Sequence, residues 1–282
     1  MLMNRIRNIW TALVLAMGLC MQAYAQLEVR LDGQRRDYIL GENVMLKVTI
    51  INHMDTAVGL SSTPGRCWLN LQVTRRGSAL PEPAASIPNY PSITIPPGSS
   101  RAYNIELKPH FSLSKEGSYS VIATLRLPDM KTTYSSNTAV FNMIAGANMR
   151  SFTVQVRGQK LRLGLKTLNI GGKDLLFGQV MNIDTRQPVG ACYMGQFLNF
   201  MEPRVALDKA QNMHMLCQST AEFFTYSVMD TYGKRRDYKI MKRTGGPVDL
   251  VSSGGGIRCI GLAPYSKSKK PKEQYHNASE RP

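Results

Sequence analysis

The chain from residue 26 onward alternates apolar and polar residues with the two-residue period of β-strands. Leu27, Val29 and Leu31 alternate with charged neighbours, and the pattern returns over residues 44–51. Turns rich in Pro and Gly separate further predicted strands at 67–74, 92–95, 102–107, 119–127 and 138–144. About seven short strands in roughly 120 residues, with no amphipathic helix among them, predict a β-sandwich.

Three motifs in this region resemble those of bacterial immunoglobulin-like domains. Residues 38–44, Tyr-Ile-Leu-Gly-Glu-Asn-Val, resemble the start of the second strand of that fold. Gly117 and Tyr119 resemble its tyrosine corner, in which the phenol packs at the end of the sandwich and its hydroxyl bonds to backbone. Trp68 stands where the fold has a buried tryptophan. The resemblance implies an immunoglobulin-like sandwich over residues 26–145, with Trp68 and Tyr119 in its core.

After a predicted linker at residues 146–148, strand patterning continues in a second domain over residues 149–264. Its segments 203–208 and 247–252 are similar, and their prolines are 44 residues apart. This period is similar to that of the four-stranded blades of β-propellers. Because three such units do not close a propeller, the alternatives are a small β-meander and a partial propeller-like domain that needs a partner. The predicted fold class is all-β, an immunoglobulin-like sandwich followed by a β-repeat domain.

The first 25 residues are typical of a signal peptide. Arg5 and Arg7 precede an uncharged apolar run over 9–21, and the run Ala-Tyr-Ala ending at Ala25 fits the cleavage rule. That run is too short to span a bilayer, and no later stretch is long and apolar enough to do so. We therefore predict cleavage between Ala25 and Gln26, export to the periplasm or the medium, and no transmembrane span in the mature chain.

The charge balance bears on the partners of such a protein. Lys and Arg number 35 against 19 Asp and Glu, a formal net charge of +16. Residues 265–282 are polar, with Lys267, Lys269, Lys270 and Lys272 among Ser and Pro, which is typical of a disordered basic tail. Since exported proteins do not normally meet nucleic acid, we expect anionic envelope polymers or glycans as partners and these four lysines as contacts. Simple solubility is the alternative explanation.

Sequence motifs of familiar catalytic and cofactor chemistry are absent. The chain has no Gly-x-Ser-x-Gly elbow, His-Glu-x-x-His helix, phosphate-binding loop or Cys-x-x-Cys pair. A nucleophile system of Cys217, His214 and Asp208 has no diagnostic spacing. We expect no catalytic residue, cofactor or metal. A hydrolytic site would require two carboxylates to converge from the set Asp184, Asp208, Asp230 and Asp249.

The remaining candidates for a functional role are sulfur-containing residues and one repeated motif. Six methionines of the second domain could supply thioethers to Cu(I), but their scattered spacing favours core packing: Met194, Met201, Met213, Met215, Met229 and Met241. Four cysteines outside the signal leave disulfides and buried reduced thiols as alternatives: Cys67, Cys192, Cys217 and Cys259. The similar segments 33–38 and 233–238 each place Arg-Arg-Asp-Tyr after a glycine and are most simply explained by chance.

The predicted function is non-catalytic binding or scaffolding at the cell envelope. The alternative is an envelope hydrolase-like or enzyme-accessory protein with its site in the repeat domain.

Overall fold

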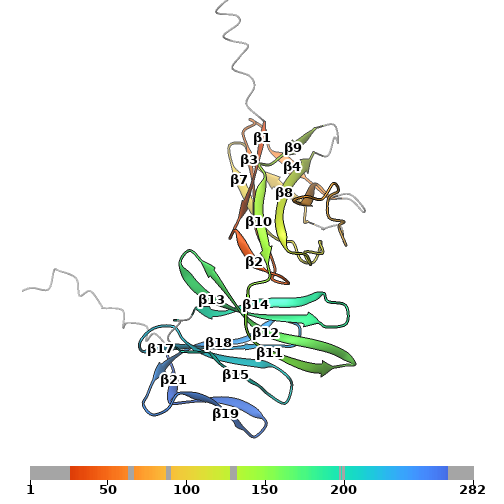
Figure 1. The fold of residues 1–282 in the computed structure, drawn as a ribbon. Helices are drawn as coiled ribbons and strands as arrows, with labels where there is room; N and C mark the ends of the chain where they lie inside the picture. Colours follow the sequence, from red (N-terminus) through yellow and green to blue (C-terminus); the bar gives the residue numbers. More distant parts are fainter. Residues whose placement is uncertain are drawn as a thin grey trace, which may run out of the picture. The chain divides into compact units, whose positions relative to one another are not determined.

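The computed structural model describes residues 26–62, 67–86, 90–127, 132–196, 198 and 201–265, which form strands joined by turns and loops (Figure 1). This confirms the predicted all-β class, because no helix occurs among these residues. Within them, therefore, no helix is long and apolar enough to cross a membrane. The described chain divides into two compact units: unit 1 holds residues 26–38 and 43–143, and unit 2 holds residues 39–42 and 144–265.

Unit 1 contains two main antiparallel sheets. The first has the order β1-β3-β7, with bounds Leu27–Gly33, Met45–Asn52 and Ser100–Glu106. The second has the order β2-β10-β8-β5, with bounds Asp37–Ile39, Ala139–Ile144, Gly117–Arg126 and Leu69–Arg75. β9 (Thr133–Ser135) adds to β8, and β4 (Val58–Leu60) pairs with β6 (Ile93–Ile95).

The core of unit 1 follows from strand alternation. Successive side chains of a strand point to opposite faces, so β1 buries only its odd-numbered apolar residues and β8 does the same. The rings of Trp68, just before β5, and Tyr103 of β7 meet edge to face with centroids 5.9 Å apart, which joins the two sheets. Trp68 is 2% exposed and Tyr119 1% exposed, so the predicted burial of both is confirmed.

Tyr119 makes the contact expected of a tyrosine corner. Its hydroxyl donates a hydrogen bond of 2.7 Å to the carbonyl oxygen of Lys115, four residues upstream. Its ring stacks on Phe141 of the neighbouring strand β10 at 5.4 Å. The corner therefore fixes the loop before β8 to the core beneath it.

Unit 2 also contains two antiparallel sheets, and each follows chain order as a meander. The first has the order β11-β12-β13-β14, with bounds Ala147–Val156, Gln159–Ile170, Lys173–Asn182 and Pro188–Gln196. The second has the order β15-β16-β17-β18-β21, with bounds Arg204–Leu207, Met213–Gln218, Phe223–Met229, Arg235–Arg243 and Leu262–Pro264. A separate hairpin joins β19 (Asp249–Ser253) to β20 (Gly256–Ile260).

The central strands β16 and β17 of the second sheet are buried on both faces. Its odd-numbered β16 residues Met213 and Met215 share a core with Leu163 and Val180 of the first sheet. Its other face, with Leu216, Phe224 and Met241, packs against apolar residues of the β19–β20 hairpin. The similar segments 203–208 and 247–252 thus each begin a hairpin, β15–β16 and β19–β20, but only the first belongs to the five-stranded sheet.

A four-residue segment from early in the chain belongs to unit 2. The backbone N–H of Ala191 donates to the carbonyl oxygen of Gly41 at 3.0 Å, and the side-chain amide of Gln179 donates to that of Leu40 at 2.9 Å. Gly41 has φ +87°, and a Cβ there would lie 3.0 Å from Cβ of Pro188. Glycine therefore meets both the conformation and the close approach that this position requires.

Candidate functional site

Most of the site residues predicted from the sequence lie outside the described residues. This holds for Ala25 at the expected cleavage point and for Lys267, Lys269, Lys270 and Lys272 of the tail. Gln26 is the first described residue, and its carbonyl oxygen accepts a hydrogen bond of 3.0 Å from the backbone of His53. The structure therefore tests neither the cleavage point nor the tail lysines, and the candidate sites lie among residues 26–265.

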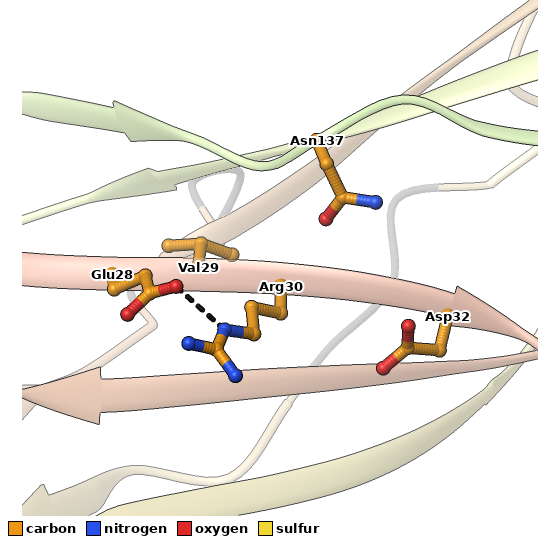
Figure 2. Close-up of a pocket in the computed structure, with 5 residues that line it drawn as sticks. All are labelled: Glu28, Val29, Arg30, Asp32 and Asn137. Carbon is orange, nitrogen blue, oxygen red and sulfur yellow. Dashed lines mark hydrogen bonds and ion pairs between the residues drawn. The ribbon is translucent and has the colours of Figure 1, made fainter.

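A shallow depression of about 440 Å³ lies beside β1 in unit 1 (Figure 2). Its lining alternates in charge along the strand, with Glu28, Arg30 and Asp32 beside Val29 and Asn137. Figure 2 shows the guanidinium of Arg30 turned back toward the carboxylate of Glu28. With two acids and one cation, the depression has no electrostatic preference for an anionic ligand.

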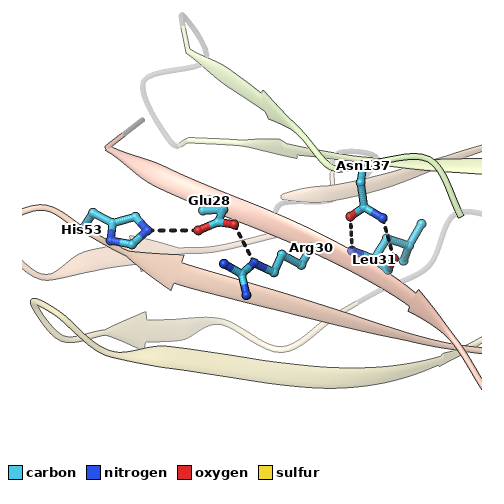
Figure 3. Close-up of polar contacts among 5 residues, drawn as sticks. All are labelled: Glu28, Arg30, Leu31, His53 and Asn137. Atoms are coloured by element: carbon cyan, nitrogen blue, oxygen red, sulfur yellow. Dashed lines mark hydrogen bonds and ion pairs between the residues drawn. The ribbon is translucent and has the colours of Figure 1, made fainter. Parts of the chain in front are cut away.

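Glu28, Arg30 and Asn137 of this depression have partners within the protein (Figure 3). The Glu28 carboxylate lies 2.5 Å from Arg30 Nε and 3.2 Å from His53 Nε2. The hydrogen bond from Arg30 lowers the pKa of the Glu28 carboxyl group most, and the bond from His53 lowers it further. The amide of Asn137 accepts from the N–H of Leu31 at 2.8 Å and donates to its carbonyl at 2.9 Å. Asn137 thereby covers part of the open edge of β1, which favours a structural role for this region.

A different surface, on unit 2, combines exposed aromatic rings with cations. We call it the Tyr238 surface and define it by Tyr193, Tyr232, Arg235, Arg236 and Tyr238. The Tyr193 and Tyr238 rings lie 6.3 Å apart, and the guanidinium carbon of Arg235 lies 4.7 Å from the Tyr238 ring centroid. Arg235 also donates to the carbonyl oxygen of Tyr193 at 3.3 Å, so two contacts position its guanidinium group. Tyr232 is 48% exposed and Tyr238 38% exposed.

The charges of the Tyr238 surface are only partly neutralised. Arg236 forms an ion pair of 2.7 Å with Asp230, yet its side chain stays 61% exposed. Asp230 in turn accepts backbone hydrogen bonds from Tyr232 and Lys234, which fixes the turn before β18. Arg235 pairs with no carboxylate among the described residues. Burial, then Tyr238, raise the pKa of Tyr193 to about 12, so its phenol stays neutral at physiological pH.

The repeated Arg-Arg-Asp-Tyr motif produces the same local stack in both units. In unit 1 the guanidinium carbon of Arg35 lies 4.5 Å from the ring centroid of Tyr38, as Arg235 lies over Tyr238 in unit 2. Tyr38 is 2% exposed and packs against Phe141, whereas Tyr238 remains accessible. The motif thus favours stacking of an arginine on a tyrosine. The tyrosine of the unit 1 copy belongs to the core, whereas the tyrosine of the unit 2 copy lies at the surface.

The outward face of the first sheet of unit 2 is also cationic. Leu161, Leu163 and Leu165 of β12 point into the core, so the even-numbered residues lie on the opposite face. This face is exposed at Lys160 and Arg162 but buried where Gln179 of β13 bonds to Leu40. Its even-numbered residues include Lys160, Arg162 and Lys166, and Lys173 of β13 lies on the same face through its pairing with Ile170. The described residues that share this face on β11, β13 and β14 include no acid. Residues 144–265 as a whole contain 16 Lys and Arg against 8 Asp and Glu.

A buried polar chain joins Asp208, His214 and Tyr226. His214 Nε2 lies 3.1 Å from Asp208 Oδ2, and its Nδ1 lies 2.6 Å from the Tyr226 hydroxyl. An ionised carboxylate can only accept, so in the neutral imidazole Nε2 donates to Asp208 and Nδ1 accepts from Tyr226. Burial raises the pKa of Tyr226 to about 12. For Asp208, burial acts to raise the pKa, but hydrogen bonds from Asn212 and His214 outweigh this effect and lower it. The chain is a satisfied network that ties β15 to β16 and β17.

The structure separates the residues of a cysteine nucleophile system. His214 faces the β19–β20 side of its sheet with Leu216 and Tyr226, whereas Cys217 lies in the core on the opposite face. The Cys217 thiol contacts the carbonyl oxygen of Gln196, and burial raises its pKa to about 12. A protonated, enclosed thiol turned away from the imidazole is a poor nucleophile.

Three of the four candidate carboxylates of the second domain have partners of their own, and the fourth, Asp184, lies in a separate turn. Asp184 lies in the turn after Asn182, Asp208 bonds to His214, Asp230 to Arg236, and the carboxylate of Asp249 lies 3.8 Å from Arg204 Nε. Among the described residues, no hydrogen bond or ion pair brings two of them to a shared group. The cysteines Cys67, Cys192, Cys217 and Cys259 are free thiols in this structure.

Sequence reasoning missed the Tyr238 surface, although part of its signal was visible. The similarity of segments 33–38 and 233–238 marked the motif, but the sequence does not show which copy is exposed. Tyr193 is brought to Tyr238 only by tertiary packing of β14 against the second sheet.

Comparison with known proteins assigns no family to this chain. No protein-family model matches it, and no curated protein matches it at the threshold of significance. Among solved structures, the sporulation control protein Spo0M of Bacillus subtilis is similar over 56% of this chain and 80% of its own, with 11% sequence identity and a TM-score of 0.31. A likeness at this TM-score identifies no function, so the candidate surfaces are judged on their own chemistry.

Proposed function

We propose that this chain is an exported, non-catalytic binding or scaffolding protein of the cell envelope, and that unit 2 holds an anionic polymer or glycan. The observation that carries the proposal is the Arg235–Tyr238 stack on Tyr193. It combines an accessible ring with a cation that is positioned by two contacts and has no carboxylate partner among the described residues. Sulfate, phosphate and carboxylate groups suit guanidinium geometry, and an accessible ring suits the apolar face of a sugar.

The cationic face of β12 supports the same ligand class. Lys160 and Arg162 are exposed, and strand residues two apart lie roughly 7 Å from each other on one face. The exposed like charges of Lys160 and Arg162 repel each other unless counterions or an anionic ligand screen them. In this proposal the tail lysines Lys267, Lys269, Lys270 and Lys272 add nonspecific attraction to the same polymer.

A hydrolase-like or enzyme-accessory function has less support. It requires two of the carboxylates Asp184, Asp208, Asp230 and Asp249 to act on one substrate, whereas Asp208, Asp230 and Asp249 each bind a different partner and Asp184 lies in a separate turn. The Asp208–His214–Tyr226 chain ends in a buried phenol with a raised pKa, which cannot serve as a nucleophile near neutral pH.

The proposal includes an immunoglobulin-like arrangement for unit 1. The strand order β1-β3-β7 opposite β10-β8-β5 fits the A-B-E and G-F-C sheets of that fold. The Tyr119 corner and the buried Trp68 support this assignment. In this proposal unit 1 serves as a scaffold and unit 2 binds the polymer.

Heparin, a sulfated glycan of defined charge, tests the proposal. We expect Arg235→Ala to weaken heparin binding by roughly fivefold at low salt, because one cation near an anionic surface contributes about 1 kcal/mol. Tyr238→Ala should weaken binding as well, because it removes the ring that positions the guanidinium.

Arg101→Ala is the matched control, since Arg101 is exposed on β7 of unit 1, whereas the Tyr238 surface belongs to unit 2. It removes the same charge and should lower the affinity much less. Equal losses for Arg235→Ala and Arg101→Ala would show that net charge alone governs binding and would refute a specific surface.

A further inference from the structure

Sulfur atoms are concentrated in the core shared by the two sheets of unit 2. Five of its eleven buried members carry sulfur, and Cys192 packs against them from the edge. The six residues come from both sheets: Cys192 and Met194 of β14, Met213, Met215 and Cys217 of β16, and Met229 of β17.

Two of these sulfur atoms lie at the separation of ligands on one metal ion. Cys192 Sγ and Met194 Sδ are 3.8 Å apart. Two sulfurs bound at about 2.3 Å with a tetrahedral angle between them would be about 3.8 Å apart. The pair comes from a bulge in β14, where the register with β13 shifts and turns both side chains toward the core.

A glycine brings further sulfur toward this pair. Gly178 is the cross-strand partner of Cys192, and a Cβ on Gly178 would lie 2.5 Å from Met229 Sδ and 3.2 Å from Met213 Cε. Because Gly178 has no side chain, the Met229 thioether occupies that space. Gly178 is therefore flanked by Cys192 across the strand pair and by Met229 from the facing sheet, which places the Met229 thioether in the same part of the core as the Cys192–Met194 pair.

We propose that Cys192, Met194 and Met229 form a binding site for one Cu(I) ion. Thiolate and thioether donors select this soft ion, and the described residues contain no group of three His, Cys, Asp or Glu side chains that would favour a harder one. As the copper–sulfur bond to Cys192 forms, the thiol proton leaves to solvent, and no electron is transferred. Cys192 is only partly buried, whereas Met194 and Met229 are fully buried.

Core packing by flexible methionines also explains an apolar, sulfur-rich interior. It predicts no copper binding and no dependence on Cys192, so a competition experiment separates the two explanations. The purified chain is mixed under anaerobic conditions with Cu(I) held by bicinchoninate, whose coloured copper complex reports every ion removed. We expect transfer of one equivalent, with only sulfur neighbours in the X-ray absorption spectrum of the bound copper.

Variants locate the ion. Cys192→Ser should lower the affinity for Cu(I) at least tenfold, and Met194→Leu, which conserves volume and apolar character, should lower it by a similar factor. Met241→Leu is the matched control, because Met241 lies in the other core of unit 2. Circular dichroism melting of each variant verifies that it folds.

Two results would overturn the proposal. In one, the unaltered chain leaves all copper with the chelator. In the other, Cys192→Ser and Met194→Leu are folded and remove copper as well as the Met241→Leu control. Both results are independent of polymer binding, so the proposed function would stand in either case.

Discussion

Trp68 joins the two sheets of unit 1 through contacts with several partners. Its ring meets Tyr90 at 5.6 Å and Tyr103 at 5.9 Å, and its indole nitrogen donates to the carbonyl oxygen of Pro91 at 3.2 Å. The Trp68 side chain therefore holds together residues that are far apart in the chain.

We expect Trp68→Ala to lower the free energy of unfolding by about 3–5 kcal/mol, because it removes a large buried side chain and leaves a cavity. Urea denaturation followed by circular dichroism measures the change. Leu80→Ala is the control, since Leu80 is 73% exposed and its loss should change stability by less than about 0.5 kcal/mol. Similar values for both variants would remove Trp68 from the core.

Asp208 makes the stability of unit 2 dependent on pH. Hydrogen bonds from Asn212 and His214 lower its pKa in the folded chain from a value of 3.8. A lowered folded pKa means that the stabilisation is complete above the unfolded pKa and is lost as pH falls through the folded pKa.

We therefore expect Asp208→Ala to cost about 1–3 kcal/mol at pH 7, where it removes a charged acceptor of three hydrogen bonds. The difference from the unaltered chain should shrink as pH falls below about 4. Thermal melts between pH 3 and pH 7 measure it. A difference that stays constant over this range would show that the carboxylate charge does not contribute.

At the scale of single residues, the sequence predicted which side chains are buried where strand alternation determines it. The burial of Trp68 and Tyr119 followed from strand period and motif, and both are confirmed. The structure places His214 and Cys217 on opposite faces of β16, an outcome that the sequence analysis did not predict. The contact of Tyr193 with Tyr238 could not be predicted, because it depends on how β14 packs against the second sheet.

At the scale of elements, long strands were predictable, and so was the three-residue strand β6 within the predicted strand 92–95, but other three-residue strands were not. β3 and β8 show the two-residue period over eight and ten residues. β2, β4 and β9 each span three residues, too few for a period, and are defined by their partner strands instead. The position of residues 39–42 in unit 2 is equally invisible in the sequence, because it rests on tertiary hydrogen bonds to Gln179 and Ala191.

The close approach of β14 to the turn before β18 gives an element-scale test. A Cβ on Gly190 would lie 2.1 Å from the carbonyl oxygen of Tyr232. Because the obstacle is backbone, Gly190→Ala must displace the turn that carries the Tyr238 surface, and we expect a loss of roughly 1–3 kcal/mol.

Gly59→Ala is its control, since a Cβ there meets nothing within 4 Å. Chemical denaturation measures the free energy of unfolding of both variants. If Gly190→Ala were as stable as Gly59→Ala, β14 and the turn at Tyr232 would not be in contact.

At the scale of the whole molecule, export is a prediction that the described residues do not test. Cleavage after Ala25 should leave a chain that begins at Gln26 and lacks the first 25 residues. The intact mass of the protein recovered from the periplasm or the medium measures this. A recovered mass that still includes residues 1–25 would contradict both processing and the proposed location.

The proposed function assigns separate contributions to the folded surface and to the tail. The Tyr238 surface should bind with defined geometry, whereas tail lysines attract any polyanion. Both attractions weaken as salt rises, since the screening length falls to about 8 Å at physiological ionic strength. A chain that ends at Tyr265 isolates the first contribution from the second.

The most direct test of polymer binding by unit 2 is the retention of this shortened chain on lipopolysaccharide or heparin across a salt gradient, compared with the full chain and with Arg235→Ala in the shortened chain. We predict that the shortened chain is retained at low salt, that it elutes before the full chain, and that Arg235→Ala elutes earlier still. If the shortened chain passes through unretained at low salt, the folded surface does not bind the polymer and the central claim is wrong.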